Sequence, residues 1–381
     1  MKKRIFALLV LSTMLASLCV SAGAAGDTSG KVVVHLKGAL EADDNLKAAM
    51  EDYSYVEWAV VVEELTASDL EGADMLIMIQ ADPAVEYTEA ELDAVVDWFG
   101  SGNKLLWVAS DSDYPDGQEL RPPDANAVLE AVGSKLRGEH GEVQDPLVNF
   151  DAAYRVKGVS DYCSEEYRFL VAGVKYAQFH GCGVVVGYLD GNYYALEDTD
   201  IEGVHVIMTS SPSGVISDES PPPPEVHEPG EQGTFALMVL EEMGNGNYVL
   251  VTSDAPFSHY SPMYKPELQK PSRYNLTSGN PQQGDVLFGN ILEFAIRNAM
   301  GATVEALEGQ VAELEAEASE LESDVEALEG QVSSLEAQVA ELEADLAKAQ
   351  SSASTMQLAA VAALVVGVVV GYFVGPLVKK S

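Results

Sequence analysis

The sequence predicts an α/β protein with a mostly parallel sheet and helices on both faces, followed by a long coiled coil and one transmembrane helix. Continuous apolar stretches alternate with amphipathic ones over residues 31–299, a pattern typical of buried parallel strands and their covering helices. A heptad repeat occupies residues 304–346, and an uncharged stretch occupies residues 358–378. These observations place a sheet-based domain before a helical rod and a membrane anchor.

Both ends of the chain indicate a secreted protein that stays attached to the membrane. Residues 2–4 are basic, an apolar run follows, and residues 22–24 are small, which is the pattern of a secretory signal peptide. The uncharged stretch near the other end is long enough to cross a bilayer as a helix. Lys379 and Lys380 follow it, and such residues stay in the cytoplasm. We therefore expect a single-pass protein of the cell membrane with an extracellular N-terminal domain and a cytoplasmic C-terminus.

The chain divides into five predicted segments. They are a signal peptide (1–25), an ectodomain (27–300) with a proline-rich loop (217–233), a coiled-coil stalk (303–350), a transmembrane helix (357–378) and a cytoplasmic tail (379–381). In the first half of the ectodomain we expect strands at 31–36, 56–65, 73–80 and 104–110, and helices at 39–52, 88–100 and 125–133. Thr88 and Glu91 have the spacing of a capping box at the start of the second helix.

The second half of the ectodomain is richer in strand signals. A hairpin is expected to turn at Asp190 and Gly191, and strands are expected at 203–211 and from residue 247. Four consecutive prolines within 217–233 cannot join a sheet or a helix interior, so this stretch is expected to be an exposed, extended loop. It is either a surface insertion or a docking peptide. A closing helix is expected at 285–299.

The composition is strongly acidic, with 61 Asp and Glu against 21 Lys and Arg and a formal net charge of −40. Such a protein is repelled by phosphate, which argues against nucleic-acid binding. The charge suits a surface exposed to salt, divalent cations or basic partners.

Two cysteines remain once Cys19 leaves with the signal peptide. An oxidising compartment favours a disulfide between Cys163 and Cys182, and two separate buried thiols are the alternative. The chain has no CxxC and no spacing of the zinc-binding type.

The heptad repeat predicts self-association along the stalk. Position a holds Val304, Val311, Ala318, Val325, Val332, Val339 and Leu346, and position d holds Leu307, Leu314, Leu321, Leu328, Leu335 and Leu342. Valine at a with leucine at d favours a parallel dimer, in a rod about 65 Å long. Every e position is Glu and no g position is basic, so a homodimer should strengthen with salt or at lower pH. A heteromer with a basic coil is the alternative.

The transmembrane stretch carries a second signal for association. Gly367, Gly371 and Gly375 repeat at every fourth residue, which lets two membrane helices approach closely. The alternative is that glycine is simply common in such helices.

Acidic residues follow three predicted strands, at Asp82, Asp111 and Asp254. The carboxyl ends of the strands in an open α/β sheet form a crevice that binds ligands, so we expect these residues and Ser110 to line one. Asp111, Asp113 and Asp116 are candidate ligands for a hard cation such as Ca²⁺, although their spacing is not that of an EF-hand. The plainer explanation is that aspartate after a strand stabilises a turn or caps a helix. Apart from this cation, no cofactor is expected.

Asn275 begins an Asn-Leu-Thr triplet, which is a possible site of glycosylation on the outer face of a membrane.

The ectodomain resembles the class I glutamine amidotransferase-like domains. More narrowly, it is similar to those of gliding-motility-type ABC transporter auxiliary proteins and their intraflagellar transport relatives. The resemblance is carried by the order of "EAELDAVVDWFGSGN", "KLLWVAS", "ANAVLEAVG", "EVQDP", "GNYVLVTSDAPFS" and "GDVLFGNILEFAIRNA". It implies an amidotransferase- or flavodoxin-like fold over residues 30–300. The layout of a stalked ectodomain on a C-terminal membrane helix looks archaeal.

The resemblance also shows what the chain lacks. In active amidotransferases the strand that corresponds to "KLLWVAS" ends in a cysteine flanked by glycine, because the nucleophile lies on a strained turn. Here Ala109, Ser110 and Asp111 follow instead. Cys182 is the other nucleophile candidate, but it precedes a predicted strand. Neither His180 nor His205 lies in a motif of an activating base.

We therefore expect a non-catalytic protein that binds or scaffolds partners at the cell surface, and the resemblance implies an auxiliary role to an ABC-type transporter. The expected partners are a second copy of the chain, the membrane and transporter subunits. An extracellular hydrolase or amidase that uses the crevice, and a structural surface-layer stalk, are the alternatives.

Overall fold

The computed structural model describes residues 30–112, 121–218, 220–257, 263–264 and 282–378. The signal peptide, Asp113, Asp116, Asn275 and the cytoplasmic tail lie outside these residues. The chain forms two compact units, residues 1–304 and 305–381, and each is described by itself.

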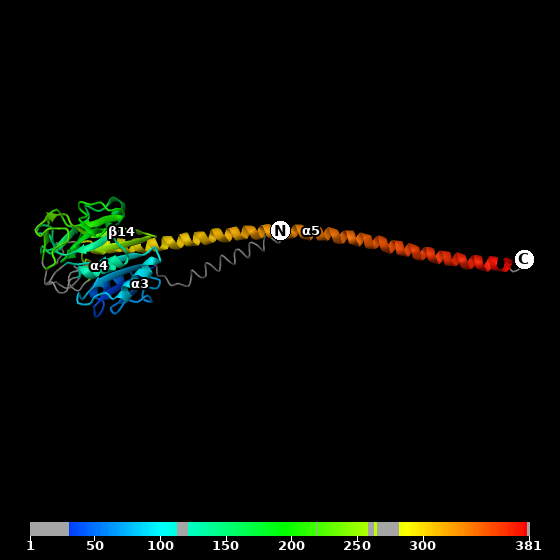
Figure 1. Ribbon diagram of the computed structural model, residues 1–381, viewed down its shortest axis with the longest axis horizontal. Helices are drawn as coiled ribbons and strands as arrows, with labels where there is room; N and C mark the ends of the chain where they lie inside the picture. Colours follow the sequence, from blue (N-terminus) through cyan, green and yellow to red (C-terminus); the bar gives the residue numbers. More distant parts are fainter. Residues whose placement is uncertain (1–29, 113–120, 219, 258–262, 265–281, 379–381) are drawn as a thin grey trace. The chain divides into compact units, whose positions relative to one another are not determined.

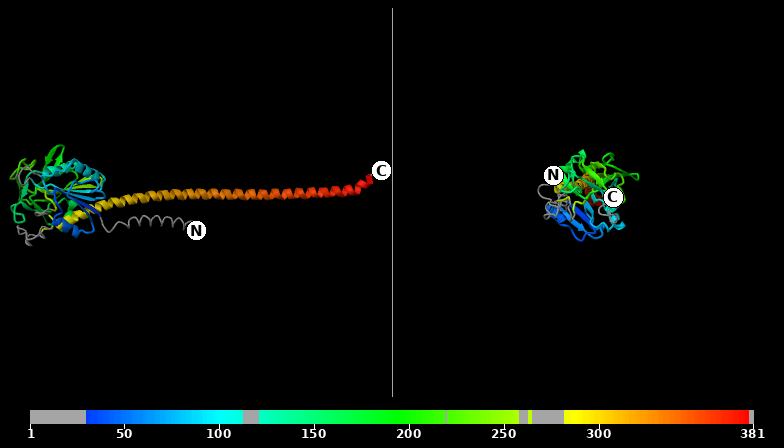
Figure 2. Two further views of the ribbon diagram at one scale, coloured as in Figure 1. Left: turned by 90° about the horizontal axis from the view of Figure 1, so that it is seen from below. Right: turned by 90° about the vertical axis from the view of Figure 1, so that its left-hand side faces the viewer.

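A nine-stranded sheet with the order β2-β1-β3-β4-β15-β14-β11-β7-β8 organises the first unit. Its parallel strands are β2 (Glu57–Val61), β1 (Lys31–Lys37), β3 (Met75–Gln80), β4 (Leu105–Ala109) and β15 (Asn247–Thr252). The sheet continues in antiparallel fashion through β14 (Ala236–Gly244), β11 (Val204–Thr209), β7 (Arg155–Val159) and β8 (Tyr176–His180). The N-terminal strands (blue and cyan) and the middle of the chain (green) occupy opposite sides of the unit (Figure 2). The expected α/β fold with a large, mostly parallel sheet is confirmed. The strands that follow β15 in the sheet order extend it in antiparallel fashion.

Helices cover both faces of this sheet because the parallel strands are apolar on both sides. In β1, Val32 and Val34 face one core and Val33 faces the other. The first core is closed by α2 (Asp44–Asp52) and the start of α5 (Gly284–Val378). The second core is closed by α3 (Glu89–Gly100) and α4 (Pro122–Ala131), which lie side by side (Figure 1).

The expected capping box at the start of α3 is present and also reaches into the core. The Thr88 side chain accepts from the Glu91 backbone N–H, and the Glu91 carboxylate accepts from the Thr88 backbone N–H. The same carboxylate is fully buried and pairs with Lys37 of β1, with Nζ and Oε2 2.5 Å apart. Although burial alone would raise the pKa of Glu91, the hydrogen bonds from Lys37, Thr88 and Leu65 lower it. One residue therefore both starts the helix and ties it to the sheet.

Two small sheets lie beside the large one. The first joins β10 (Asn192–Tyr194), β9 (Val184–Leu189) and β5 (Leu136–Glu139), and the second joins β13 (Gln232–Gly233), β12 (Gly214–Ser217) and β6 (Glu142–Gln144). The expected hairpin is the β9–β10 pair, with Asp190 and Gly191 both at positive φ. The proline-rich stretch begins at the last residue of β12 and ends in β13, and its described residues between the two strands, 218 and 220–231, form no helix or strand. It is not wholly exposed, because His227 is only 4% exposed.

The expected disulfide is absent, and Cys163 and Cys182 are both free and buried. In the antiparallel pair β7–β8, Arg155 lies opposite His180 and Val159 opposite Tyr176. Cys182 follows His180 and Cys163 follows Val159, so the two cysteines lie beyond opposite ends of this strand pair. Five residues of strand span about 14–17 Å, whereas a disulfide needs Cα atoms within about 7 Å. The alternative of two separate buried thiols is the one observed.

The closing helix, the heptad repeat and the apolar stretch form one continuous helix, α5. Its described valine and leucine side chains at heptad positions are exposed, including Val325 at 52% and Leu328 at 58%. Ala318 is partly exposed, and the side chains of Val304 and Leu307 lie outside the described residues. The coiled coil therefore stays a prediction. Within the described residues, one helical stretch in Ala316–Val368 is long and apolar enough to cross a membrane, judged by length and composition.

Candidate functional site

The two central parallel strands β4 and β15 end in the same way. Ala109 and Thr252 are paired in the register, and each is followed by Ser-Asp, as Ser110-Asp111 and Ser253-Asp254. Because the strands run in the same direction, both Ser-Asp pairs emerge at one end of the sheet. The structure thus brings together three of the four residues expected to line a crevice.

Asp111 is held in an uncommon conformation and in contact with a cation. Its φ of 75° lies in the left-handed region, which Asp tolerates better than most residues. The carboxylate is 3.1 Å from a guanidinium nitrogen of Arg121 and accepts from the Ser112 N–H at 2.9 Å. Burial raises the pKa of Asp111 to about 6, and the Arg121 charge and Ser112 hydrogen bond only partly oppose this effect.

Asp254 is still more deeply enclosed. Its carboxylate accepts from the backbone N–H groups of His180 and Ala255, each at 2.7 Å. Burial, followed by the charge on Asp111, raises the pKa of Asp254 well above its usual range. A negative charge nearby disfavours ionisation of a carboxyl group, so the Asp111 carboxylate opposes ionisation of Asp254.

Arg121 joins this pair to the neighbouring strand. Its Nε donates to the carbonyl of Gln80 at the end of β3, at 3.0 Å. Its Nη1 is the nitrogen that contacts the Asp111 carboxylate. Arg121 and Asp111 keep side-chain exposures of 22% and 27%, so they are the accessible part of the site. No sequence signal singled out Arg121, which precedes two prolines in a polar stretch.

Asp82, the fourth expected residue, makes a contact within its own turn. Its carboxylate accepts from the backbone N–H of Ala84 at 3.0 Å, and it therefore stabilises its own turn after β3. This is the plainer role that aspartate after a strand often has.

The strand ends are covered, so the expected crevice is closed over Ser110. Ser110 is 1% exposed, and a Cβ on Gly138 of β5 would lie 1.7 Å from its Oγ. Asn126 of α4 fixes the backbone of Gly138, donating to its carbonyl at 2.9 Å and accepting from its N–H at 2.7 Å. Gly183 covers Asp111, the residue after Ser110, in the same way. A Cβ on Gly183 would lie 2.7 Å from the Asp111 carbonyl oxygen.

Cys182 directly precedes Gly183 and lies in an environment unsuited to a nucleophile. Its side chain is fully buried, and burial, followed by the charges on Asp254 and Glu142, raises the pKa of the thiol well above its usual range. A protonated thiol is a poor nucleophile. Burial and the charge of Arg155 lower the pKa of His180 to about 4, which keeps its ring neutral.

The proline-rich stretch is fastened to the end of β5 by two crossed pairs, which we call the clasp. Glu139 pairs with His227, whose Nδ1 is 2.5 Å from the carboxylate, and His140 pairs with Glu225 at 2.6 Å. Glu197 contacts the other nitrogen of His227 at 3.5 Å. Although burial alone would lower the pKa of His227, the two glutamates raise it to about 10. No local signal indicated this pairing, because a proline-rich acidic stretch is typical of an exposed loop.

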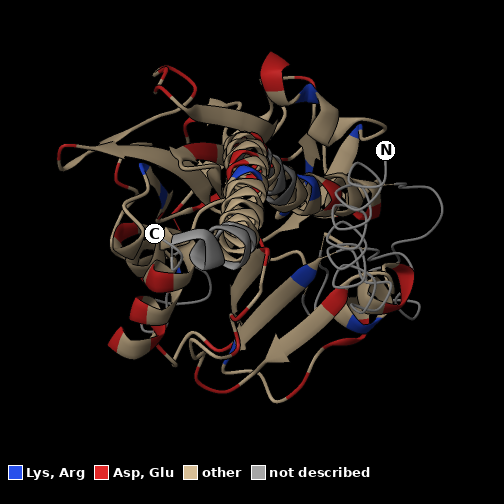
Figure 3. Ribbon diagram, turned by 90° about the vertical axis from the view of Figure 1, so that its right-hand side faces the viewer, with Lys and Arg blue, Asp and Glu red and all other residues tan. Residues whose placement is uncertain are grey.

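Charge is unevenly distributed over the chain. Acidic positions recur along loops and helix edges, whereas basic positions are few and scattered (Figure 3). The strand-end site is also more acidic than basic, because it holds two carboxyl groups, Asp111 and Asp254, and one cation, Arg121.

Comparison with known proteins finds remote structural likeness alone. No protein family model matches the sequence, and no curated protein matches it. Among solved structures, the chain is similar to the "mmIFT52 N-terminal domain", with 10% identity and a TM-score of 0.43 over 70% of this chain and 96% of that one. It is also similar to a protein from Thermoplasma acidophilum described as a GMP synthase subunit, with 10% identity and a TM-score of 0.34 over 73% of this chain and 98% of that one.

Proposed function

We propose that this chain is a membrane-anchored cell-surface protein whose α/β unit binds or scaffolds partners without catalysing a reaction. The observation that carries the proposal is the burial of Ser110 under Gly138. Ser110 occupies the strand end where the amidotransferases that the sequence resembles carry their nucleophile. A substrate carbonyl cannot approach a hydroxyl that is covered by a backbone segment.

The surroundings of Ser110 give a second reason. A serine nucleophile needs a base within hydrogen-bond reach, and among the described residues the Ser110 hydroxyl has no hydrogen-bond partner. The nearby carboxyl groups have raised pKa values, and the nearby His180, whose ring is neutral, donates its backbone N–H to Asp254. None of these groups is hydrogen-bonded to the Ser110 hydroxyl, so none is placed to activate it.

The mode of attachment follows from α5. We propose that the heptad positions pair with a second copy of the chain in a parallel coil, since their exposed valine and leucine side chains would each gain about 1 kcal/mol or more on burial. The apolar stretch would cross the membrane and the terminal lysines would stay in the cytoplasm. The most concrete partner, drawn from the sequence resemblance, is an ABC-type transporter.

An extracellular hydrolase remains the second candidate, because paired carboxyl groups with raised pKa values are also a feature of acid catalysts.

Two measurements separate the candidates. The first is purification of the full-length protein in mild detergent from its own membrane, with mass spectrometry of the material that co-purifies. A stoichiometric ATPase and permease supports the auxiliary role.

The second measurement is a screen of the same preparation against ester and amide substrates, with Asp111→Asn and Ser110→Ala as variants and Arg168→Gln as the matched surface control. Activity that disappears in the first two variants and persists in the third would establish the hydrolase and end the non-catalytic proposal. Absence of activity together with a defined partner would support the binding role.

A further inference from the structure

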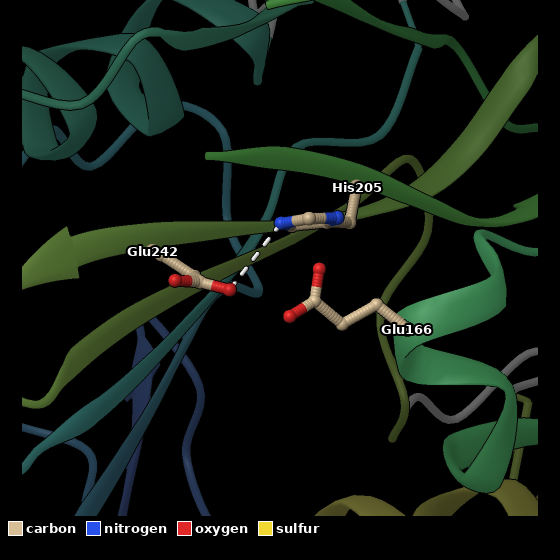
Figure 4. Close-up of side chains that lie close together, drawn as sticks. All are labelled: Glu166, His205 and Glu242. Carbon is tan, nitrogen blue, oxygen red and sulfur yellow. Dashed lines mark ion pairs between the residues drawn. The ribbon is translucent and has the colours of Figure 1, made fainter. Parts of the chain in front are cut away.

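We propose that Glu166, His205 and Glu242 form a binding site for a divalent transition-metal ion of the Zn²⁺ type. Each residue offers one ligand atom, and these atoms all lie within 4.8 Å of one another. In Figure 4 the Glu166 carboxylate points toward the space beside His205 and Glu242, which come from two neighbouring strands. Nε2 of His205 is 3.4 Å from Oε1 of Glu242. Zinc takes nitrogen and oxygen ligands at about 2.0–2.2 Å, so binding needs only a small inward shift of the Glu166 side chain.

Strand pairing places two of the ligands. His205 of β11 lies opposite Leu240 of β14, and Glu242 follows Leu240 by two residues, so His205 and Glu242 are diagonal neighbours on one face of the sheet. The Tyr167 hydroxyl donates to Oε1 of Glu242. A hydrogen bond to a ligating carboxylate is the type of support that orients metal ligands.

The third ligand is carried by the short helix η1 (Glu165–Val171), which is fixed to the same strands. The Ser164 N–H donates to the carbonyl of Val206 at 2.8 Å. Tyr167 is 5% exposed, and its ring centroid lies 4.6 Å from that of His205. These contacts hold the start of η1 over β11, so Glu166 is presented to His205 by a fixed part of the fold.

The charges of the cluster are not balanced by protein cations. Among the described residues, neither Glu166 nor Glu242 has a Lys or Arg within ion-pair distance, and the nearby Arg168 pairs with Glu165 at 3.4 Å. Two carboxylates and an imidazole suit a bound dication electrostatically. The imidazole favours a transition metal, because Ca²⁺ and Mg²⁺ prefer oxygen ligands alone.

The site is separate from the strand-end carboxyl pair. Glu242 lies opposite Tyr248 at the start of β15, whereas Thr252 at the other end of β15 lies opposite Met238. Asp254 therefore lies beyond the opposite end of the same strand. Side-chain exposures of 17% for His205 and 40% for Glu242 leave room for water or a partner's side chain at the remaining coordination positions.

The test is equilibrium dialysis of the full-length protein in detergent. The protein is first stripped with a chelator and then titrated with ZnCl₂ in a buffer that contains millimolar Ca²⁺ to occupy weak acidic sites. We expect one strong Zn²⁺ site per chain. Glu166→Gln, His205→Ala and Glu242→Gln should each weaken it at least tenfold, and Glu165→Gln, which changes the adjacent exposed glutamate, should not.

Glu166→Gln decides the matter if the other variants fold poorly, because this side chain is exposed and makes no ion pair in the described structure. Circular dichroism of the metal-free protein checks the fold of each variant. Co²⁺ absorption spectra provide an independent readout of nitrogen and oxygen ligation in the wild type and in Glu166→Gln. Equal Zn²⁺ affinity in the wild type and in Glu166→Gln, or an equal loss in Glu165→Gln, would overturn the proposal.

Discussion

His227 and Glu139 form a buried ion pair, with Nδ1 and Oε2 2.5 Å apart, that fastens the proline-rich stretch to the end of β5. Glu139 also accepts from the backbone N–H groups of Val226 and His227, at 2.5 and 2.8 Å. The carboxylate therefore holds both the ring and the backbone of the stretch. Gly138 of β5 also covers Ser110. The clasp therefore stabilises the strand that covers the strand-end site.

Replacing His227 should release the proline-rich stretch. We expect His227→Gln to lower the free energy of unfolding by about 3–5 kcal/mol, because it leaves Glu139 buried without a cation. Limited proteolysis, read by mass spectrometry, should then show cleavage within 217–233 at protease concentrations that leave the wild type intact. Glu228→Gln, an exposed change in the same stretch, is the control. Resistance of His227→Gln equal to that of the control would contradict this role of the pair.

The same pair predicts a loss of stability at alkaline pH. Its histidine has a pKa raised from 6.5 to about 10 in the folded protein, so the folded state binds the proton more tightly than the unfolded state. The stabilisation is complete below about pH 6.5 and disappears as the pH rises through about 10. Thermal unfolding from pH 7 to 10.5 should show a fall in the midpoint for the wild type and a smaller fall for His227→Gln. Parallel curves for the two proteins would exclude this linkage.

Asp111 is expected to destabilise the fold at neutral and alkaline pH. Its pKa of about 6 in the folded state exceeds the ordinary value of 3.8, so the cost of ionising it is present above pH 6 and disappears below about pH 4. Asp111→Asn should therefore stabilise the protein by about 1–2 kcal/mol at pH 8 and have little effect at pH 4. Asn also tolerates the positive φ. Denaturant unfolding at the two pH values measures the difference, and an equal effect at both would show that ionisation is not the cause.

The cover over Ser110 can be tested by adding one methyl group. Gly138→Ala should destabilise the fold by about 1–3 kcal/mol through overpacking, since the new Cβ would lie 1.7 Å from Oγ and 2.8 Å from Cβ of Ser110. Ser110→Gly removes both atoms, and the double variant should recover much of the loss. Gly100→Ala, where no atom lies within 4 Å of the new Cβ, is the matched control. Additive effects of Gly138→Ala and Ser110→Gly would contradict the contact.

Much of the parallel half of the fold could be predicted, because its signals are local. Continuous apolar runs identify β1, β3 and β4, and the spacing of Thr88 and Glu91 identifies the start of α3. The antiparallel extension through β14, β11, β7 and β8 could not be predicted, because strand order depends on long-range pairing that no local pattern encodes. The expected disulfide was wrong for the same reason, since the β7–β8 register separates Cys163 from Cys182.

Only the part of the strand-end site that directly follows the parallel strands could be predicted. The Ser-Asp pairs after β4 and β15 follow strands that a sequence can locate, so their convergence could be expected. Arg121, His227 and the Glu166 cluster had no local signal, because their partners come from distant segments. The sequence around His205 is that of an ordinary strand, whereas the structure places its ring beside two glutamates.

The stalk gives the last prediction, which concerns the acidic flanks of the heptads. In a parallel dimer, Glu322 at position e lies near Glu317 at position g of the partner helix, so the pair repels mildly. Glu322→Lys should replace two repulsions per dimer by two attractions and strengthen association by about 0.5–1 kcal/mol at low salt, with the gain shrinking as salt screens the charges. Sedimentation of the full-length protein in density-matched detergent, at low and high salt, measures the dimer fraction. The wild type should gain dimer with salt while Glu322→Lys gains less or loses some. Glu326→Lys, at the outward-facing position b, controls for net charge, and an equal response of the two variants would argue against a parallel homodimer.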